Sequence, residues 1–209
     1  MSTYKFNNAL ILVFAKQPVA GKVKTRMIPR LDSAAALALH KELIELVCKT
    51  VIDSGLCPLQ IWVTAGREEA FFQSLARPAD LFLQQGDDLG ARMAHAASTA
   101  LQTVESVVII GADCPSVDAA YLDQALTALH AGEEIVIGPA EDGGYVLLGL
   151  RRLSAALFRD IDWGSAAVMQ QTRQALTAAG ERWQELPLRW DVDRPEDLAR
   201  YERLKVRLK

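Results

Sequence analysis

Cysteine and histidine are scarce in this sequence, and their positions argue against the sites these residues usually build. There are three cysteines among 209 residues, namely Cys48, Cys57 and Cys114. They are odd in number and form no CxxC pair, so the sequence predicts neither a disulfide framework nor a zinc site. The three histidines fall inside or at the end of predicted helices and are not expected to be catalytic; they are His40, His95 and His130. Cysteine usage of this kind fits a reducing, cytoplasmic compartment best.

An excess of charge of one sign is also lacking. The chain has 23 Lys and Arg against 26 Asp and Glu, a formal net charge of −3. Such a balance gives no overall attraction to nucleic acid or to an anionic membrane, so neither partner is expected. Any anion site must therefore come from cations gathered locally.

Long hydrophobic runs are missing too, which argues against a membrane span. The apolar run at 9–15, "ALILVFA", is far too short to cross a bilayer. Lys16, Gln17 and Pro18 follow it in place of a small-residue cleavage site, so a signal peptide is not predicted. We expect a buried first strand.

Half of the residues are hydrophobic, enough for a full core, and the length suits one domain covering 1–209. Apolar residues recur at helical spacing across 33–54, and Gly55 follows as a stop signal. Beyond it, short apolar runs alternate with helix-like segments. The expected strands are 59–65, 81–84, 106–113 and 134–140, and the expected helices are 67–76, 89–103 and 118–131.

This alternation predicts an α/β fold, a mostly parallel sheet with helices on both faces in three layers. The run at 145–150 follows the preceding strand after a short turn, too close for a crossover, so it is expected to be antiparallel or a mixed-sheet insertion. The remaining segments expected are a helix at 165–179, a short strand at 183–190 and a last helix from 195.

A cationic loop follows the first predicted strand. Residues 16–26 contain Lys16, Lys22, Lys24 and Arg26 around Gly21. The P-loop and GxGxxG spacings are absent, so the loop is equally well a solvated basic turn. However, ligands of open α/β sheets bind beyond the carboxyl ends of the strands, where a glycine and several cations suit a diphosphate.

Carboxylates follow two later strands. Asp113 comes after "VVIIGA", and Asp191 and Asp193 come after the last predicted strand. Together they could hold Mg²⁺, which prefers oxygen ligands. Asp113 alone could cap a turn before Pro115. Asp193 could be the N-cap of the last helix in a capping box with Glu196, so we rank Asp191 above Asp193 as a ligand.

The segment "EDGGY" at 141–145 has two interpretations. Asp-Gly-Gly between apolar runs is a hairpin signal, which alone explains Gly143 and Gly144. Asp142 would nevertheless reach the same edge of the sheet as Asp113, where a carboxylate can accept hydrogen bonds from sugar hydroxyls. Trp163 fits packing better than stacking on a ligand.

Six ordered segments together resemble the DUF2064 family, whose members are described as GT-A-type glycosyltransferases and include the group assigned to arsenosugar biosynthesis. The resemblance extends over about 9–198. The segments are "VFAKQPVAGKVKTRM", "QGDDLGARM", "IIGADCP", "IGPAEDGGYVLLGL", "FRDIDWGS" and "WDVDRPEDL". The resemblance implies a nucleotide-diphospho-sugar transferase fold, a nucleotide sugar as donor, and Mg²⁺ or Mn²⁺.

On that resemblance, the donor's nucleotide and phosphates are assigned to Lys16, Lys24, Arg26 and the backbone of Gly21, with Gly143 and Gly144 near the sugar. Asp113 with Asp191 or Asp193 would hold the metal, and Asp142 would position the sugar or act as base toward an unidentified acceptor.

One departure supports an alternative. Many GT-A enzymes carry a DxD triplet, whereas this chain has Asp113-Cys114-Pro115. A single Asp there resembles the related nucleotidylyltransferases that act on phospholactate or the molybdenum cofactor, which join an NTP to a phosphorylated substrate and release pyrophosphate. A nucleotide-binding subunit without catalysis is a third, less favoured interpretation.

Overall fold

A seven-stranded sheet organises the molecule, in the order β3-β2-β1-β4-β6-β5-β7. The computed structural model describes residues 4–28 and 30–208. All neighbouring strands are parallel except β6, which runs antiparallel to both β4 and β5, so the expectation for 145–150 is confirmed. The strands are β1 (Ala9–Ala15), β2 (Leu59–Val63), β3 (Leu81–Leu83), β4 (Ser106–Gly111), β5 (Ile135–Pro139), β6 (Tyr145–Leu150) and β7 (Gln184–Glu185).

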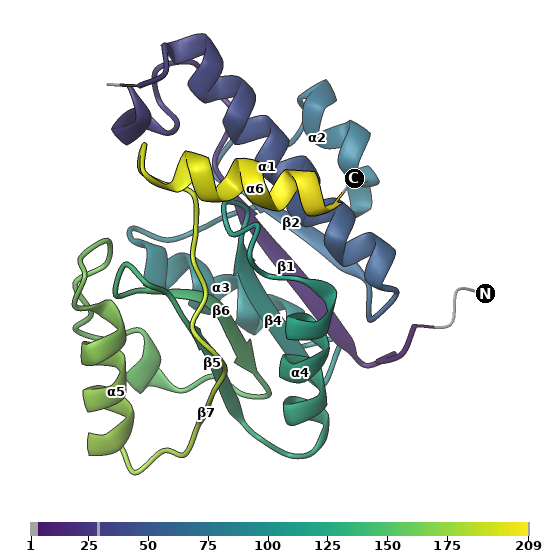
Figure 1. Ribbon diagram of the computed structural model, residues 1–209. Helices are drawn as coiled ribbons and strands as arrows, with labels where there is room; N and C mark the ends of the chain where they lie inside the picture. The colour runs from purple at the N-terminus through teal and green to yellow at the C-terminus, as the bar shows by residue number, and fades with distance from the viewer. Residues whose placement is uncertain (1–3, 29, 209) are drawn as a thin grey trace.

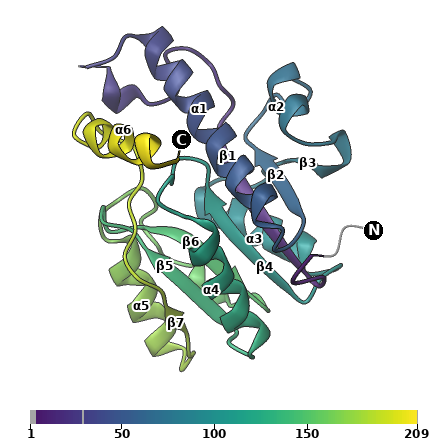
Figure 2. The same ribbon diagram turned by 45° about the vertical axis from the view of Figure 1, so that its right-hand side comes forward.

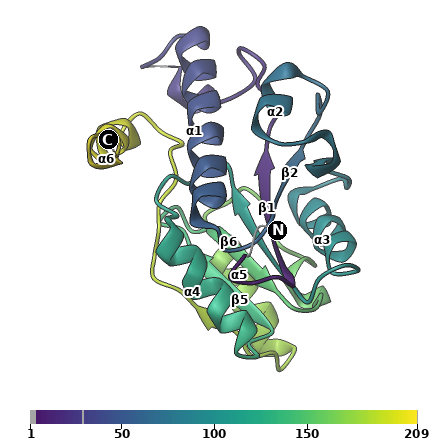
Figure 3. The same cartoon turned by 90° about the vertical axis from the view of Figure 1, so that its right-hand side faces the viewer.

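Helices cover both faces of this sheet, as Figures 1 and 3 show, with α1 and α4 on one side and α3 and α5 on the other. The helices are α1 (Ser33–Ser54), α2 (Ala70–Leu75), α3 (Leu89–Ala100), α4 (Ala119–His130), α5 (Val168–Ala178) and α6 (Asp197–Leu208). Short 3₁₀ turns are η1 (Thr25–Met27), η2 (Pro78–Asp80) and η3 (Ala155–Leu157). None of the helices in the described residues has the length and apolar character needed to cross a membrane.

The two layers of core follow from the alternation of side chains along each strand. In β1, Ile11 and Val13 pack on the side of α1 and α4, whereas Leu10 and Leu12 pack on the side of α3 and α5. Because the central strands are buried on both faces, they read as continuous apolar runs. The predicted three-layer α/β fold is therefore confirmed.

Local signals set the helix ends. The Asp32 carboxylate accepts a hydrogen bond from the Ala35 N–H at 2.7 Å and starts α1. Asp88 and Asp118 do the same for α3 and α4. At its far end α1 stops at Gly55, which has a φ of +60°, as its sequence signal predicted.

The predicted strand at 183–190 is wrong in extent. Only Gln184 and Glu185 form β7, and the chain then continues along β5 without regular pairing. Pro187 interrupts the ladder because it has no N–H to donate. Before Pro187, the Leu186 N–H still donates to the Ile137 carbonyl. Beyond Pro187, the Arg189 N–H donates to the Pro139 carbonyl and the Glu141 N–H donates to the Arg189 carbonyl.

The last helix, α6, crosses the amino-terminal half of α1 away from the sheet (Figure 2). A third apolar cluster lies beneath it, consisting of Met27, Leu39, Leu43, Val192 and Tyr201. Packing of α6 thus anchors both the loop after β1 and the segment that carries Asp191 and Asp193.

Candidate functional site

A cavity of about 650 Å³ opens at the carboxyl-terminal ends of strands β1, β2 and β4. Cationic, anionic and apolar side chains all contribute to its walls. Its charged lining residues are Lys16, Lys24, Arg26, Arg92, Asp87, Asp88, Asp113, Asp142, Asp191 and Asp193. The structure therefore gathers three of the four loop cations, Lys16, Lys24 and Arg26 but not Lys22, and all four predicted aspartates around one space.

Lys24 joins three segments at the floor of the cavity. Its side chain is only 4% exposed, and its ammonium donates to Asp113 Oδ2 at 3.0 Å and to the Val192 carbonyl at 2.6 Å. The backbone of Lys24 is left-handed, with a φ of +48°. Residues with side chains adopt this conformation rarely, and such strain tends to occur at functional sites.

Asp113 follows β4 directly, and its carboxylate faces the cavity with 41% of the side chain exposed. Partial burial would raise its pKa, but the Lys24 ammonium outweighs burial and holds the pKa of Asp113 below its ordinary value. For Lys24, burial would lower the pKa, and Asp113 raises it above its usual range. The two groups are therefore a charged pair at neutral pH.

Asp191 and Asp193 occupy different electrostatic environments. Burial, then repulsion from Asp113 and Asp142, raises the pKa of Asp191 to about 7. Asp193 instead accepts from Arg26 Nη1 at 2.5 Å. The capping-box prediction for Asp193 is wrong, because α6 begins at Asp197, whose carboxylate accepts from the N–H groups of residues 193 and 194.

Asp142 lies at the turn between β5 and β6 and accepts from the Gly144 N–H at 2.9 Å. Gly144 lines the cavity, but Gly143 does not. Gly143 has a φ of +93°, and a Cβ there would lie 2.1 Å from the Ala166 carbonyl oxygen. The role of Gly143 in the structure is to let this turn lie against the segment before α5.

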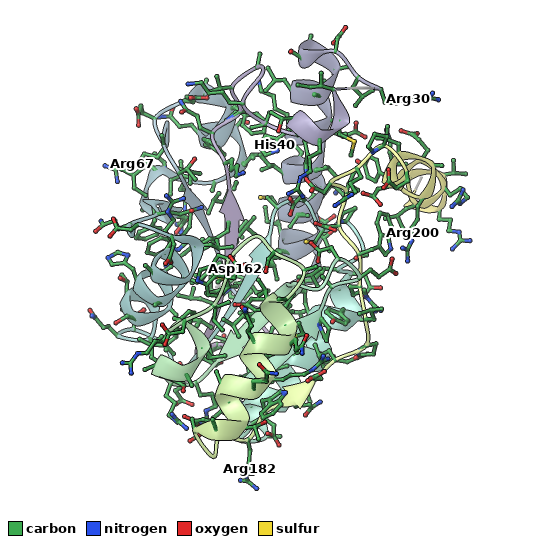
Figure 4. All side chains as sticks on the ribbon, turned by 90° about the vertical axis from the view of Figure 1, so that its left-hand side faces the viewer. Arg30, His40, Arg67, Asp162, Arg182 and Arg200 are labelled. Atoms are coloured by element: carbon green, nitrogen blue, oxygen red, sulfur yellow. The ribbon has the colours of Figure 1, made fainter. Side chains whose placement is uncertain are left out.

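In the loop after β1, Lys16 and Arg26 line the cavity, whereas Gly21 is exposed and lies outside its lining. His40 of α1, labelled in Figure 4, holds this loop through Nε2, 3.0 Å from the Lys16 carbonyl. Burial first, and then nearby Lys24, lowers the pKa of His40, so the ring is neutral and donates to that carbonyl.

Several cavity residues were not singled out from the sequence. Gln84 donates from Nε2 to the Trp62 carbonyl at 2.9 Å and to the Ala15 carbonyl at 3.3 Å, so its amide bridges the ends of β1 and β2. Tyr145 lies at the start of β6 and also lines the cavity. The strand-end position of Gln84 was a usable signal, but the buried position of Tyr145 depends on tertiary packing.

The acidic side of the cavity offers donors that suit a divalent cation. Asp191 has no ion-pair partner among residues 4–28 and 30–208, and its pKa is raised first by burial and then by the Asp113 and Asp142 carboxylates. Within the same residues, no group of three or more His, Cys, Asp or Glu side chains forms a ready metal site. Two carboxylates therefore suit Mg²⁺ or Mn²⁺ only where substrate phosphates and waters complete the coordination shell.

Comparison with known proteins identifies relatives of this chain. The sequence profile of DUF2064, described as "Uncharacterized protein conserved in bacteria", matches residues 47–165. No curated protein sequence matches. A crystal structure of a "putative nucleotide-diphospho-sugar transferase" from Desulfovibrio desulfuricans G20 is 32% identical, with a TM-score of 0.82, over 90% of this chain and 84% of that one.

More distant structures share the fold alone. CMP:2-keto-3-deoxy-manno-octonic acid synthetase in complex with CTP has a TM-score of 0.66 at 11% identity, covering 97% of this chain and 100% of that one. Rv0371c from Mycobacterium tuberculosis H37Rv in complex with manganese has a TM-score of 0.53 at 17% identity, covering 95% and 98%.

Proposed function

The chain belongs to the DUF2064 family, and from this premise we propose that it is a transferase that uses a nucleotide-diphospho-sugar as donor and moves the sugar to a hydroxyl acceptor. The observation that carries this proposal is that the cationic loop after β1 and the aspartates Asp113, Asp142 and Asp191 line the same cavity. A sugar diphosphate presents anionic oxygens beside neutral hydroxyls, and this lining offers cations for the former and carboxylates for the latter.

We assign the diphosphate to Lys16 and Arg26, whose guanidinium is exposed enough to exchange Asp193 for a phosphate. Lys24 has two of its three N–H donors committed to Asp113 and Val192, so its main effect is to hold Asp113 in place and add positive potential. Gly21 remains a proposed backbone contact for the nucleotide. Asp142 and Gly144 are assigned to the sugar.

Asp113 and Asp191 are the proposed metal ligands. Asp193 is assigned a supporting role, because its carboxylate is paired with Arg26. When bound, Mg²⁺ or Mn²⁺ supplies Lewis-acid stabilisation of the charge that develops on the leaving diphosphate. The manganese complex of Rv0371c supports this assignment through the shared fold only.

In the proposed reaction the acceptor oxygen forms a bond to the anomeric carbon of the sugar as the bond from that carbon to the diphosphate breaks. The nucleoside diphosphate leaves with the electron pair, and Asp142 accepts the proton of the acceptor hydroxyl. One Asp142 oxygen already accepts from the Gly144 N–H, which fixes the carboxylate and leaves the other oxygen available.

A second candidate is nucleotidyl transfer, in which the phosphate of a substrate attacks the α-phosphorus of an NTP and releases pyrophosphate. The observation that favours it is the single carboxylate after β4, where Asp113 is followed by Cys114 and Pro115. The CTP complex of CMP:2-keto-3-deoxy-manno-octonic acid synthetase is consistent with it through the fold.

Product analysis separates the two candidates. Wild-type protein is incubated with nucleotide sugars or NTPs and Mg²⁺, Mn²⁺ or EDTA, with water as the stand-in acceptor of the sugar or nucleotidyl group, and release of nucleoside diphosphate or pyrophosphate is measured. We expect metal-dependent release of nucleoside diphosphate from one nucleotide sugar, abolished in Asp113→Asn. Asp123→Asn is the matched control, because Asp123 pairs with Lys5 outside the cavity. Pyrophosphate release from an NTP alone would replace the first candidate by the second.

A further inference from the structure

Part of the cavity lining is apolar and belongs to the face of the sheet that α3 and α5 cover, and we call this part the apolar branch. Ile109 of β4 and Leu148 of β6 are paired in register and form its floor. The walls are formed by Met93, Tyr145, Trp163 and Val168. No charged group takes part in this set, in contrast to the loop end of the same cavity.

A buried hydroxyl in this branch has no partner. The Tyr145 hydroxyl is inaccessible to solvent and makes no hydrogen bond within the described part of the chain. Burial raises its pKa, so the group stays protonated and remains a hydrogen-bond donor. Buried polar groups in folded proteins nearly always have a partner, so this hydroxyl points to one that binds from outside the chain.

The loop 158–167 contributes Trp163, Gly164 and Ser165 to the cavity lining, and its position is defined by close packing. Trp163 packs edge-on against Tyr145, with 6.2 Å between ring centroids and 88° between ring planes. A Cβ on Gly90 would lie 2.5 Å from the Trp163 ring, so the indole rests directly on the backbone of α3. In the view of Figure 4, Asp162 marks this loop between α3 and α5.

We propose that this apolar branch binds the acceptor, and that the acceptor is a small alcohol with an aromatic or aliphatic body that carries one further hydrogen-bond-accepting oxygen. The apolar body lies between Met93, Leu148 and the Trp163 ring, and the Tyr145 hydroxyl donates to the further oxygen. This inference rests on the proposed sugar transfer, since it names the molecule that receives the sugar. Asp142 and Tyr145 line the same cavity, so the proposed base belongs to the space that would receive the reacting hydroxyl of such a molecule.

The apolar walls of the branch and its one hydrogen-bond donor, the Tyr145 hydroxyl, argue against sugar and protein acceptors. A polysaccharide or a free sugar would leave many hydroxyls unpaired against Ile109, Leu148 and Val168. The branch lies beneath a loop and a helix, so a folded protein surface does not reach it.

Binding of 4-methoxybenzyl alcohol tests the proposal, because it combines a ring, an ether oxygen and a hydroxyl. Its affinity is measured by saturation-transfer NMR titration with the full chain, and methyl glucoside is the polar comparison. We expect binding of the aryl alcohol only, with about fivefold to tenfold weaker affinity in Tyr145→Phe from the loss of one hydrogen bond. Trp163→Ala is expected to weaken it further.

Tyr121→Phe is the matched control, because the Tyr121 hydroxyl already donates to the Pro187 carbonyl at 2.8 Å and lies outside the cavity. It should leave the affinity of the aryl alcohol unchanged. Equal affinity of wild type and Tyr145→Phe for the aryl alcohol would overturn the role of the hydroxyl. A Tyr145→Phe protein that differs from wild type only by a higher melting temperature would overturn it as well. Preference for methyl glucoside, or no binding of the aryl alcohol, would overturn the acceptor class.

Nucleotide binding is measured separately, by calorimetry with nucleoside diphosphates and Mn²⁺. Absence of nucleotide binding with retained binding of the aryl alcohol would reject the proposed function and leave the apolar branch a ligand site. Nucleotide binding without binding of the aryl alcohol would reject this inference and leave the proposed function standing.

Discussion

Lys24 illustrates how one residue can hold a site together. Its ammonium links the loop after β1 to Asp113 after β4 and to the Val192 carbonyl before α6, three segments far apart in the sequence. The side chain is almost fully buried and the backbone is left-handed. A buried cation is costly unless paired, so the pair with Asp113 is what allows Lys24 to occupy this position.

Replacing Lys24 by Met should destabilise the fold and disable the site together. Loss of a buried partner costs about 3–5 kcal/mol when the remaining charge is fully buried. Asp113 is 41% exposed, so we expect a smaller loss, about 2 kcal/mol, in the free energy of unfolding by urea. Lys22→Met, an exposed neighbour in the same loop, is the control and should change stability by less than about 0.5 kcal/mol. Equal losses for both variants would contradict the structural role of Lys24.

The cysteines allow a second test at the residue scale. All three are buried, and burial raises the pKa of Cys48 and Cys57 to about 12 and that of Cys114 well above its usual range. With a pKa near 12, roughly one thiol in ten thousand is ionised at pH 8. We therefore expect no fast reaction of the native protein with Ellman's reagent at pH 8 and three thiols per chain in guanidinium. One rapidly labelled thiol in the native state would contradict this burial.

At the scale of elements, α6 stabilises the site from outside. Tyr201 is fully buried beside Met27 and Val192, and its hydroxyl donates to Glu42 at 3.1 Å. At the surface, Arg200 forms a two-pronged ion pair with Glu141, next to Asp142. The helix thereby connects α1, the loop after β1 and the β5–β6 turn.

Truncation of Tyr201 should accordingly destabilise the elements that α6 holds together around the cavity. Removing a fully buried ring costs about 3–5 kcal/mol, so Tyr201→Ala is expected to lower the free energy of unfolding by that amount. Tyr201→Phe keeps the ring and loses only one hydrogen bond, a cost of about 1 kcal/mol. Urea unfolding measures both changes. A cost below about 1 kcal/mol for Tyr201→Ala would show that α6 is not integral to the fold.

The helices and strands also show which features of the fold could be predicted from the sequence alone. The periods of the apolar residues indicated the three-layer fold and the antiparallel β6, because both depend on local pattern and loop length. The prediction of a strand over 183–190 was wrong in extent because it did not allow for Pro187, which cannot donate to the ladder. The capping box at Asp193 failed because α6 begins only at Asp197, and the Asp193 carboxylate pairs instead with Arg26, 167 residues away. The place of Tyr145 in the cavity and the contact of His40 with the Lys16 carbonyl could not be predicted for the same reason, because both depend on tertiary packing.

For the whole molecule, the arrangement implies a conflict between stability and function. Asp113 follows β4, Asp142 lies at the β5–β6 turn and Asp191 lies between β7 and α6, and of these three carboxylates Lys24 pairs only with Asp113. Asp191 has no cationic partner in the described ranges, so its charge opposes folding in the absence of ligand. Uncompensated charge of this kind is typical of a binding site whose missing partner is the ligand.

Asp191→Asn should therefore stabilise the free protein while weakening ligand binding. Removing a charge that is partly buried, and that Asp113 and Asp142 repel, is expected to raise the free energy of unfolding by about 0.5–1 kcal/mol, within the range for relief of functional strain. The proposed metal shell loses one oxygen anion, so Mn²⁺-dependent affinity for a nucleoside diphosphate should fall tenfold or more. Urea unfolding and calorimetry measure the two changes. Asp53→Asn is the control, because Asp53 pairs with Lys49 on the surface and its loss should yield no gain in stability. A destabilised Asp191→Asn protein that keeps full affinity would mean that Asp191 serves the fold rather than the ligand.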